Sequence, residues 1–535
     1  MFKKFLSSIV AGTILVSITP AFSFKVTADS DYKLGLTEEN SSYMKEHCTI
    51  VPMGVDTIIP YRGLASSVDL SESIYFPEIG DQGLLGACTS FATTYYQFSY
   101  EVNRLNNITD ISEQVIYSPK WTYNLANNGI NEGTNWGNNY SILETFGALK
   151  NSDFEYTGNQ NDYTYLPPMN VEEKIEALKF RLSNINEIHV PVDANISSPN
   201  SSVLNNIKLQ LNSGKVLAAA TDCVFNSKVV DGKCIAYRCT SSSNGGHAVA
   251  IVGYDDNKWV DINGDGVKQT AEKGALKVAN SWGKNFSSHG ISSNDGFFWV
   301  AYDSLNYKSQ VSGNWESSLT GTRCPTFSEY NVNIGAQPYN VFFSIDVEEK
   351  SPNLIGGLYV NTTNREALNL NYKRIFKDND TSWSNNGAID LATFDGLDGS
   401  NSHISFNGYI IFDYSNLADT VAHFHKNYIW QLEISDYSDI SSARFYLFDD
   451  KSNFVTGPSY FSCNSGNSYY TSCPLNLSLG DVNYTGNVTA ADADIVLEYV
   501  AGKRDFSKIQ YFLADITKDG FVDLTDAVAL AQLTA

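Results

Sequence analysis

Four residues of this 535-residue chain have the types and settings needed to cleave an amide bond through a covalent intermediate. Cys88 stands where an apolar run with helical spacing begins, and a helix N-terminus favours the thiolate form of cysteine. His247 opens a strand-like run and can exchange a proton with a thiol, while the Asn280 side chain can orient the imidazole. Gln82 lies six residues before Cys88, and its amide can donate to an oxyanion together with the Cys88 backbone N–H.

Two loops near the C-terminus repeat each other, with starts 34 residues apart. Each places oxygen-bearing side chains at positions 1, 3, 5 and 12 and glycine at position 6, which is the pattern of an EF-hand calcium loop ending in Asp. A solvated acidic tail would not explain this duplicated register. With a backbone carbonyl at position 7, the expected calcium ligands are Asp481, Asn483, Thr485, Asn487 and Asp492, and then Asp515, Thr517, Asp519, Phe521 and Asp526.

A third loop lies between the runs that carry His247 and Asn280, and it matches D-x-[DN]-x-[DN]-G-x5-E at every fixed position. The alternative is a turn without an ion, because Asx and Gly residues also favour tight turns. A glutamate at the last position has no evident role in such a turn, and we therefore expect calcium. Its ligands would be the side chains of Asp261, Asn263, Asp265 and Glu272 and the backbone carbonyl of Val267.

The elements that must position these residues follow from hydrophobic periodicity. Apolar residues recur at helical spacing after Cys88, so a helix is expected to begin there. Helices before strands indicate an α+β domain with two lobes. Further helices are expected at 173–182 and 205–211, and strands at 215–220, 247–254, 275–279 and 296–302.

The chain changes character after residue 320. Short alternating runs separated by Asn, Asp, Gly and Ser clusters are typical of an all-β sandwich, which we expect at 320–474. Its aromatic residues are compatible with sugar binding, although a sandwich also buries many aromatics. Each of the two C-terminal calcium loops is followed by an apolar helical run, so residues 478–535 are expected to form a small α-helical module.

The first residues resemble an export signal in composition. Two lysines precede a mostly apolar run at 5–22, and cleavage is expected after Ala28, with Ser23 as the competing position. An uncleaved membrane anchor is the alternative, but the run is short and interrupted by polar residues. We therefore expect a signal peptide at 1–28, an extension at 29–60, and a secreted, extracellular mature protein without a membrane span.

The composition of the chain argues against several classes of partner and cofactor. A net charge of −23 argues against nucleic acid or anionic lipid as a partner. No zinc motif is present, and no redox or nucleotide cofactor is expected. Eight cysteines in an exported chain permit disulfides. We expect Cys463 to pair with Cys473, and Cys223 to pair with either Cys234 or Cys239.

The order Gln, Cys, His, Asn in DQGLLGACTSFA, GGHAVAIVGY and LKVANSWG resembles the papain-like cysteine peptidases, here in a secreted bacterial form. The resemblance covers residues 60–310 and implies that Cys88 attacks the substrate and that His247 acts as acid and base. It further implies that Asn280 orients the imidazole and that Gln82 stabilises the oxyanion. Residues implied to line or shield the cleft are Gly133, Trp136, Gly246 and Trp282.

The chain departs from the family pattern at three places. Thr89 stands where the family has Trp after the nucleophile, and Leu85 replaces a cysteine that many members have three residues before it. The long helical propeptide of the family is missing, because the extension at 29–60 is too short to copy it. Latency is therefore expected to be controlled in a different way.

The duplicated loop and helix pattern resembles a type I-like dockerin. The resemblance implies calcium-dependent binding to a cohesin on a scaffoldin, as in cellulosomes. Dockerins commonly present loop positions 10 and 11 to the cohesin, which here are Ala490 and Ala491 in one repeat and Leu524 and Thr525 in the other. Because the two pairs differ, symmetric binding in two modes is not expected.

We therefore expect a two-lobed papain-like domain at 61–310, an all-β module at 320–474 and a dockerin at 478–535. The expected function is a cysteine endopeptidase that hydrolyses protein or peptide substrates through a Cys88 acyl-enzyme. Its dockerin would attach it to a cell-surface or cellulosome-like complex engaged in polysaccharide catabolism. One alternative keeps the enzyme but restricts it to maturing other components of the complex. The other is a non-catalytic binding or adhesion subunit, which four intact catalytic residues disfavour.

Overall fold

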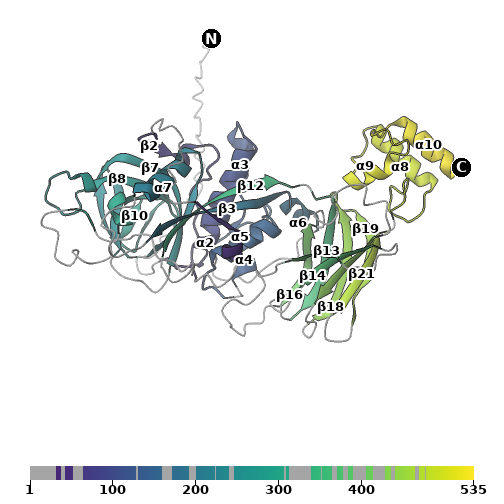
Figure 1. Ribbon diagram of the computed structural model, residues 1–535, viewed down its shortest axis with the longest axis horizontal. Coiled ribbons are helices and arrows are strands. Elements are labelled where there is room, and N and C mark those ends of the chain that lie inside the picture. Colours follow the sequence, from purple (N-terminus) through teal and green to yellow (C-terminus); the bar gives the residue numbers. More distant parts are fainter. Residues whose placement is uncertain are drawn as a thin grey trace, which may run out of the picture.

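The computed structural model contains three parts in chain order, which Figure 1 shows from purple to yellow. We call them the N-terminal domain (described residues between 32 and 350), the β-sandwich (352–475) and the C-terminal module (477–535). The predicted signal peptide, Cys223 and Cys324 lie outside the described residues. The described residues are 32–37, 43–51, 64–127, 130–159, 171–191, 201–222, 224–239, 246–306, 309–311, 339–350, 352–363, 370–376, 384–389, 405–413, 428–434, 440–463, 469–475 and 477–535.

The N-terminal domain has its longer helices early in the chain and most of its strands later, as the sequence predicts for an α+β domain. Its helices are α1 (Tyr43–His47), η1 (Leu70–Glu72), α2 (Cys88–Ser90), η2 (Phe91–Phe98), α3 (Ser99–Leu105), η3 (Ile111–Glu113), α4 (Pro119–Ala126), α5 (Trp136–Thr145), α6 (Val171–Ala177), α7 (Ser201–Asn212), η5 (Thr270–Glu272) and η6 (Tyr302–Leu305). Its strands are β1 (Cys48–Ile50), β2 (Ser67–Asp69), β3 (Phe180–Pro191), β4 (Leu217–Asp222), β5 (Phe225–Val230), β6 (Lys233–Cys239), β7 (Gly246–Trp259), β8 (Lys273–Ala279), β9 (Phe286–Ser288), β10 (Ile291–Ser293), β11 (Phe297–Ala301) and β12 (Tyr339–Glu349).

The main sheet of the N-terminal domain runs in the order β1-β3-β12-β4-β7-β8-β11-β6-β5, with β2 added beside β7. Strand β12 pairs antiparallel with β3 on one side and with β4 on the other. Its side chains Phe342, Phe343 and Ile345 are fully buried. The sequence placed this strand in the all-β module at 320–474, and that placement is wrong: β12 completes the core of the N-terminal domain.

The helix that starts at Cys88 continues through η2, which is π-helical, into α3. Almost all of its side chains are buried, so its polar residues need internal partners. Gln97 supplies the clearest case: its amide donates to the carbonyls of Val216 (3.0 Å) and Phe343 (2.8 Å) and accepts from the Tyr140 hydroxyl (2.8 Å). These bonds fix the helix against the sheet and so fix the position of Cys88.

The expected helix at 173–182 is only partly correct. Helix α6 ends at Ala177, and Phe180 already begins strand β3. The apolar residues at the end of the predicted helix instead pair with β12, where Phe180 lies opposite Glu349 and Leu182 opposite Val347. The extended conformation of these residues depends on pairing with β12, which is distant in sequence. The spacing of apolar residues within the segment does not reveal that partner. The helix at 205–211 and the four predicted strands are present with shifted ends.

Two sheets that share one apolar core form the β-sandwich. Their strand orders are β16-β13-β18-β19 and β15-β14-β17-β21-β20. Buried residues of both sheets belong to the same apolar cluster, for example Leu358 and Leu447 in one sheet and Leu432 in the other. The strands are β13 (Leu354–Thr362), β14 (Leu370–Phe376), β15 (Ser384–Ile389), β16 (Phe406–Asp413), β17 (Tyr428–Ile434), β18 (Ile440–Asp449), β19 (Phe454–Tyr460), β20 (Ser462–Cys463) and β21 (Tyr469–Leu475).

The β-sandwich packs directly against helix α6 of the N-terminal domain. Ile175 and Leu178 are buried in one cluster with Ile355, Ile411 and other residues of the sandwich. An ion pair between Arg181 and Asp413, both nearly inaccessible to solvent, and a 2.5 Å hydrogen bond from Lys174 to the Tyr409 carbonyl add polar contacts. Burial lowers the pKa of Lys174 to about 8.

The C-terminal module consists of α8 (Ala490–Val500), α9 (Lys508–Ala514) and α10 (Leu524–Thr534). Its core joins Val482, Val496 and Leu530, so the two loop and helix repeats pack on each other. Figure 1 shows this module beyond the end of the β-sandwich that carries the label β19. Among the described residues, no helix is long and apolar enough to cross a membrane.

The structure tests part of the expected cysteine pairing. Cys234 is a buried free thiol, which excludes it as the partner of Cys223. Cys463 lies on β20 and Cys473 on the neighbouring strand β21. Their disulfide stays a prediction.

Candidate active site

Cys88, the predicted nucleophile, is the first residue of α2 and is completely buried. The backbone N–H of Ala248, the residue after His247, donates to its sulfur at 3.4 Å. Burial raises the pKa of the Cys88 thiol, and hydrogen bonds from the backbone N–H groups of Ala248 and Gly35 partly oppose that shift. The structure thus places the thiol beside the strand that carries the predicted base.

His247, near the start of β7, forms a 2.7 Å hydrogen bond from its Nε2 to Oδ1 of Asn280, which directly follows β8. Its Nδ1 has no hydrogen-bond partner among the described residues, which leaves this nitrogen for proton exchange with the thiol. The Trp282 ring stacks on the imidazole, with centroids 4.6 Å apart and an interplanar angle of 25°. Trp282 is fully buried, so it keeps water from the His–Asn bond, as the resemblance implies.

Gln82 is held so that its amide nitrogen faces the cleft. Its Oε1 accepts from the Ser281 hydroxyl at 2.6 Å, and its backbone N–H donates to the Ser281 carbonyl at 2.7 Å. Its Nε2 donates to the Leu85 carbonyl and to the Lys33 carbonyl, both at 2.8 Å. A backbone carbonyl of the N-terminal extension therefore already accepts from the donor predicted to stabilise the oxyanion.

Residues 32–37, which we call the N-terminal segment, lie in this cleft. Leu36 donates from its backbone N–H to the Gly246 carbonyl at 3.0 Å. On the opposite side, the Thr134 N–H donates to the Gly35 carbonyl at 2.8 Å, and the Thr37 N–H donates to the Thr134 carbonyl at 3.1 Å. The segment is thus bound through its backbone to both walls of the cleft, in the manner of an added strand.

Side chains of the N-terminal segment add two further contacts. The Tyr32 ring stacks on Trp282 at 5.2 Å and 9°, on a tryptophan that also stacks on His247, and its hydroxyl donates to the Trp282 carbonyl at 3.0 Å. Lys33 donates from its ammonium group to the Asn131 carbonyl. These contacts hold the segment on both sides of the Lys33 carbonyl.

Glycines allow this close approach. A Cβ added at Gly35 would stand 1.8 Å from the carbonyl oxygen of Gly86, and one added at Gly133 would stand 2.1 Å from the carbonyl oxygen of Gly35. Gly133 also has φ +113°, a conformation that other residues rarely adopt. Backbone meets backbone here without intervening side chains, and every other residue type at position 35 would clash.

Electrostatics fit a covered site. Burial lowers the pKa of His247 to about 4, although the hydrogen bond to Asn280 acts in the opposite direction. Burial also raises the pKa of Cys88. With the segment in place, both groups are therefore uncharged at neutral pH, and the thiolate needed for attack is disfavoured.

The structure brings Cys88, His247, Asn280 and Gln82 together at one cleft. Of the expected cleft residues, Gly133, Gly246 and Trp282 contact the N-terminal segment. Trp136 instead begins α5 and is buried against Phe343 and Tyr140.

Sequence reasoning did not assign roles to Tyr32, Gly35 and Thr89. Thr89, at the position of the family's tryptophan, donates from its hydroxyl to the Thr134 carbonyl at 3.0 Å and so supports the wall of the cleft. The sequence offered little indication of the role of Gly35, because a single glycine in a polar extension belongs to no periodic pattern.

The two C-terminal loops close in the same way, and their donor sets fit calcium. Asp481 at position 1 accepts from the Gly486 N–H at 2.8 Å, and Asp515 accepts from the Gly520 N–H at 3.0 Å. Asp492 at position 12 folds back to position 3, accepting from the Asn483 N–H at 3.1 Å. No three His, Cys, Asp or Glu side chains converge as a metal site in the described part of the chain. In these loops Asn, Thr and carbonyl oxygens would complete the ligand set.

The internal loop at 261–272 closes in a similar way. Asp261 accepts from the N–H groups of Gly264 (2.8 Å) and Gly266 (3.2 Å). Glu272 is buried and accepts from the N–H groups of Ile262 (2.8 Å) and Gln269 (3.1 Å). The expectation that Glu272 has no role in an ion-free turn is therefore wrong. The ammonium of Lys228 donates to the Asp261 carbonyl, which already places a positive charge beside the loop.

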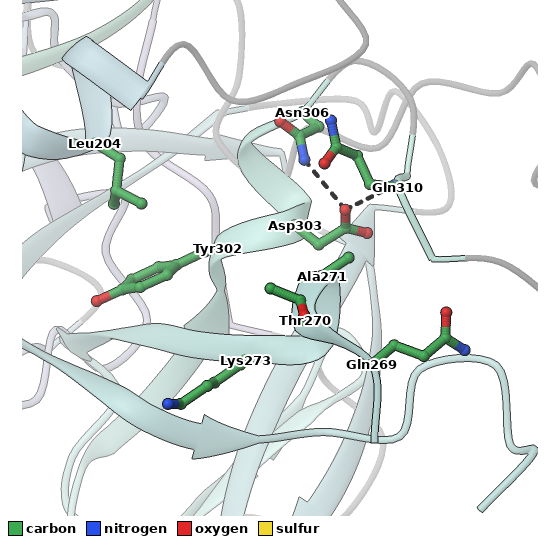
Figure 2. Close-up of a pocket in the computed structure, with 9 residues that line it drawn as sticks. All are labelled: Leu204, Gln269, Thr270, Ala271, Lys273, Tyr302, Asp303, Asn306 and Gln310. Atoms are coloured by element: carbon green, nitrogen blue, oxygen red, sulfur yellow. Dashed lines mark hydrogen bonds between the residues drawn. The ribbon is translucent and has the colours of Figure 1, made fainter. Parts of the chain in front are cut away.

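A separate cavity of about 480 Å³ is lined by residues of α7, η5, β8 and η6, none of them catalytic (Figure 2). Asp303 is its main charged acceptor. Its carboxylate accepts from the Asn306 amide at 3.1 Å and the Gln310 N–H at 2.8 Å, bonds that Figure 2 marks with dashed lines. These bonds and a third from Ser309 occupy the Asp303 carboxylate.

Comparisons with known proteins match two parts of the chain to known families. Residues 64–306 match the family model of the papain family cysteine proteases, and residues 479–533 match that of the dockerin type I domain. A Cathepsin L-like proteinase of Fasciola hepatica is 30% identical over 113 residues, which are 20% of this chain and 33% of that protein. Vignain of Phaseolus vulgaris is 24% identical over 265 residues, which are 48% of this chain and 58% of that protein.

The chain thus spans between a third and three fifths of the length of these relatives. Among solved structures, xylellain, a cysteine protease from Xylella fastidiosa, is similar with a TM-score of 0.37 and 17% identity. That alignment covers 59% of this chain and 97% of xylellain.

Proposed function

The chain contains a papain-family cysteine protease domain and a dockerin type I domain, and we propose that it is a secreted endopeptidase held in a multiprotein complex. The observation that carries the proposal is the convergence of Cys88, His247, Asn280 and Gln82 at one cleft. The 2.7 Å bond between His247 and Asn280 leaves Nδ1 for the thiol. A non-catalytic scaffold would have no need for this arrangement.

In the proposed reaction, His247 takes the proton of Cys88, and the thiolate attacks the carbonyl carbon of the scissile bond. Gln82 and the Cys88 backbone N–H stabilise the oxyanion that forms. His247 then gives its proton to the leaving amine, and a thioester remains on Cys88. Water, deprotonated by His247, hydrolyses the thioester and restores the thiol.

The N-terminal segment keeps this site latent. Its backbone is bound to both walls of the cleft, and the Lys33 carbonyl accepts from Gln82, so no substrate carbonyl can be bound there at the same time. Activation therefore requires that residues 32–37 leave the cleft, by displacement or by cleavage. The proposed latency thus comes from a short segment that acts directly on the catalytic groups.

The test measures peptide hydrolysis before and after limited proteolysis of the segment. Cys88→Ala and His247→Ala should abolish hydrolysis, and Asn280→Ala should reduce it. A thiol alkylator should label Cys88 faster than any other free cysteine, once the segment has been removed. Undiminished hydrolysis by the Cys88→Ala protein would end the assignment, and an inactive wild-type protein after removal of the segment would favour the binding-subunit alternative.

The C-terminal module is proposed to bind a cohesin on a scaffoldin, with calcium in both loops. Two exposed apolar residues of the second repeat, Phe521 (68% exposed) and Leu524 (57%), give it the larger contact surface. The matching positions of the first repeat are Asn487 and Ala490. We propose that the second repeat makes the main contact.

The binding experiment uses the Cys88→Ala protein and a panel of purified cohesins, with calcium or with chelator. Deletion of 478–535 should abolish binding, and Leu524→Asp should weaken it far more than Ala490→Asp. Equal losses from the two charge substitutions would contradict the proposed use of the second repeat. Calcium at the internal loop is proposed as well, on the match of residues 261–272 to the calcium-loop pattern at every fixed position. If calcium binds there, the melting temperature of a chain ending at residue 475 should rise with calcium. Asp265→Ala should remove this rise.

A further inference from the structure

The C-terminal module touches the β-sandwich through one of its two calcium loops. Tyr484, at position 4 of the first loop, donates from its hydroxyl to Oδ2 of Asp449 at 2.8 Å and lies 3.0 Å from the Ser507 hydroxyl. Asp449 is the last residue of β18, and it is completely buried. Beside it, the backbone N–H of Lys508 donates to Oδ1 of Asp450 at 3.0 Å.

A buried carboxylate needs donors, and Asp449 obtains them from two parts of the chain. Within its own hairpin it accepts from the N–H groups of Lys451 and Asn453, both at 2.9 Å, and from the Asn453 side-chain amide. Tyr484 supplies the donor that comes from outside the hairpin.

Apolar packing reinforces these bonds. Ile509 and Leu513 of α9 are buried in the same apolar cluster as Phe445 and Val455 of the β-sandwich. Tyr484 is partly buried and packs against this cluster. The contact therefore combines a buried charge-assisted bond with excluded water, which distinguishes it from a chance approach of two surfaces.

The two repeats differ at this position. Lys518 occupies position 4 of the second loop with φ +60°, and Tyr484 occupies it in the first with φ +59°. Both backbones are left-handed, so both side chains project from equivalent places on the loop. Lys518 is exposed. The duplicated loops thus share a backbone conformation but not a role.

We propose that Tyr484 clasps the first calcium loop to the β18–β19 hairpin, so that calcium in this loop fixes the orientation of the C-terminal module on the β-sandwich. This inference rests on the proposed calcium binding. Tyr484 stands between Asn483 and Thr485, two of the expected ligands, and their coordination would hold its left-handed backbone in place. Because coupling is reciprocal, the clasp should also strengthen calcium binding at this loop.

With the clasp formed, the first loop contacts the β-sandwich. The loop of the second repeat remains available to a partner. A partner bound there would meet a module of fixed orientation, and the cleft of the N-terminal domain would keep a fixed relation to the complex. A partner could then bind through the first repeat less readily than through the second, so the two binding orientations of the module would differ in affinity.

The experiment is hydrogen–deuterium exchange of the full-length Cys88→Ala protein, with calcium or with chelator. Calcium should slow exchange in peptides of both loops and also in the hairpin peptide at 449–453, which is in another domain. In the Tyr484→Phe protein the hairpin should exchange at least about tenfold faster than in the parent with calcium, as expected for losing a hydrogen bond to a charged group. Lys518→Met, at the equivalent position, should leave the hairpin unchanged.

Ligand variants separate the loops. Asp481→Ala should remove the calcium response of the hairpin, and Asp515→Ala should keep it. If both loops are protected by calcium but the hairpin is not, the clasp is wrong and calcium binding stands. If neither loop is protected, the proposed calcium binding fails and the clasp mechanism fails with it. A hairpin that responds equally in Tyr484→Phe and in the parent also overturns the proposal.

Discussion

The N-terminal segment lies against the site that holds His247 and Cys88. Burial lowers the pKa of His247 to about 4 and raises that of Cys88, so the covered site holds a neutral imidazole and a thiol. When the segment leaves, water returns to the cleft, and both values should move back towards those of exposed groups. We therefore expect that opening the cleft favours the reactive thiolate–imidazolium pair.

This coupling predicts that acid opens the cleft. A histidine whose pKa is lowered in the covered state binds a proton more weakly there than in the open state. The covered state is thus stabilised above the ordinary histidine pKa of about 6.5 and loses that advantage as the pH falls towards 4. The measurement compares melting temperatures of Cys88→Ala and Cys88→Ala/His247→Gln between pH 7 and pH 4.

The difference between these two proteins isolates His247 from the carboxylates that also titrate in this range. We expect the protein that keeps His247 to lose more stability on acidification, by at most about 1.4 kcal/mol for each pH unit. If the melting temperatures of the two proteins fall in parallel as the pH is lowered, the titration of His247 does not control the covered state.

At the residue scale, the sequence was a good guide to catalytic groups and a poor guide to what covers them. Cys88, His247, Asn280 and Gln82 each stand in a motif with a chemical reason for the residue type. Gly35 has no such motif. Its importance comes from the Gly86 carbonyl, which a Cβ at Gly35 would approach to 1.8 Å, and only the folded chain brings the two together.

Among the elements, the N-terminal segment is the one that we propose controls activity. It adds as a short strand between Thr134 and Gly246, so it is held mainly by backbone hydrogen bonds and tolerates many side chains. Gly35 is the exception, because a side chain there collides with backbone atoms that cannot move aside.

Gly35→Leu should therefore expel the segment and raise the basal peptidase activity of the full-length chain. The expected increase is at least about tenfold, since a steric clash with backbone of this size costs more than about 1.4 kcal/mol. The assay is hydrolysis of a small peptide without prior proteolysis. Gly408→Ala is the matched control: its added Cβ would meet nothing closer than the Phe406 ring at 3.5 Å. Unchanged activity in Gly35→Leu would contradict latency through the segment.

Two element predictions show where sequence patterns stop being informative. The expected helix at 173–182 has helical spacing throughout, yet its last residues belong to β3 because β12 offers them a partner. Strand β12 itself alternates as a sandwich strand would, and the pattern does not say which sheet it joins. Periodicity identifies a strand, while the choice of sheet depends on contacts distant in sequence.

In the whole molecule, β12 links the first two parts of the chain. It lies between β3 and β4 of the N-terminal domain, and only four residues separate its end at Glu349 from β13 of the β-sandwich. The sandwich then rests on α6 through the cluster of Ile175 and Ile355 and the pair of Arg181 and Asp413. A short connection and a buried contact make the two parts one unit, whereas the sequence suggested two separate modules.

We expect the catalytic unit to extend through β12. A chain ending at residue 310 contains all four catalytic residues but lacks β12, whose Phe342, Phe343 and Ile345 are fully buried. Each such side chain contributes about 1.5–3 kcal/mol by burial, so roughly 5–9 kcal/mol is lost from a domain whose total stability is about 5–15 kcal/mol. We expect this chain to be unfolded or aggregated.

A chain ending at residue 475 keeps β12 and its supports, and it should unfold in one cooperative transition. A chain ending at residue 350 keeps β12 but exposes the apolar face of α6, so its melting temperature should be lower than that of the 475-residue chain. Calorimetry of the three chains, each with Cys88→Ala to prevent self-cleavage, gives the comparison. A folded chain ending at residue 310 would show that β12 is dispensable, and the boundary at 310 suggested by the sequence would then be correct.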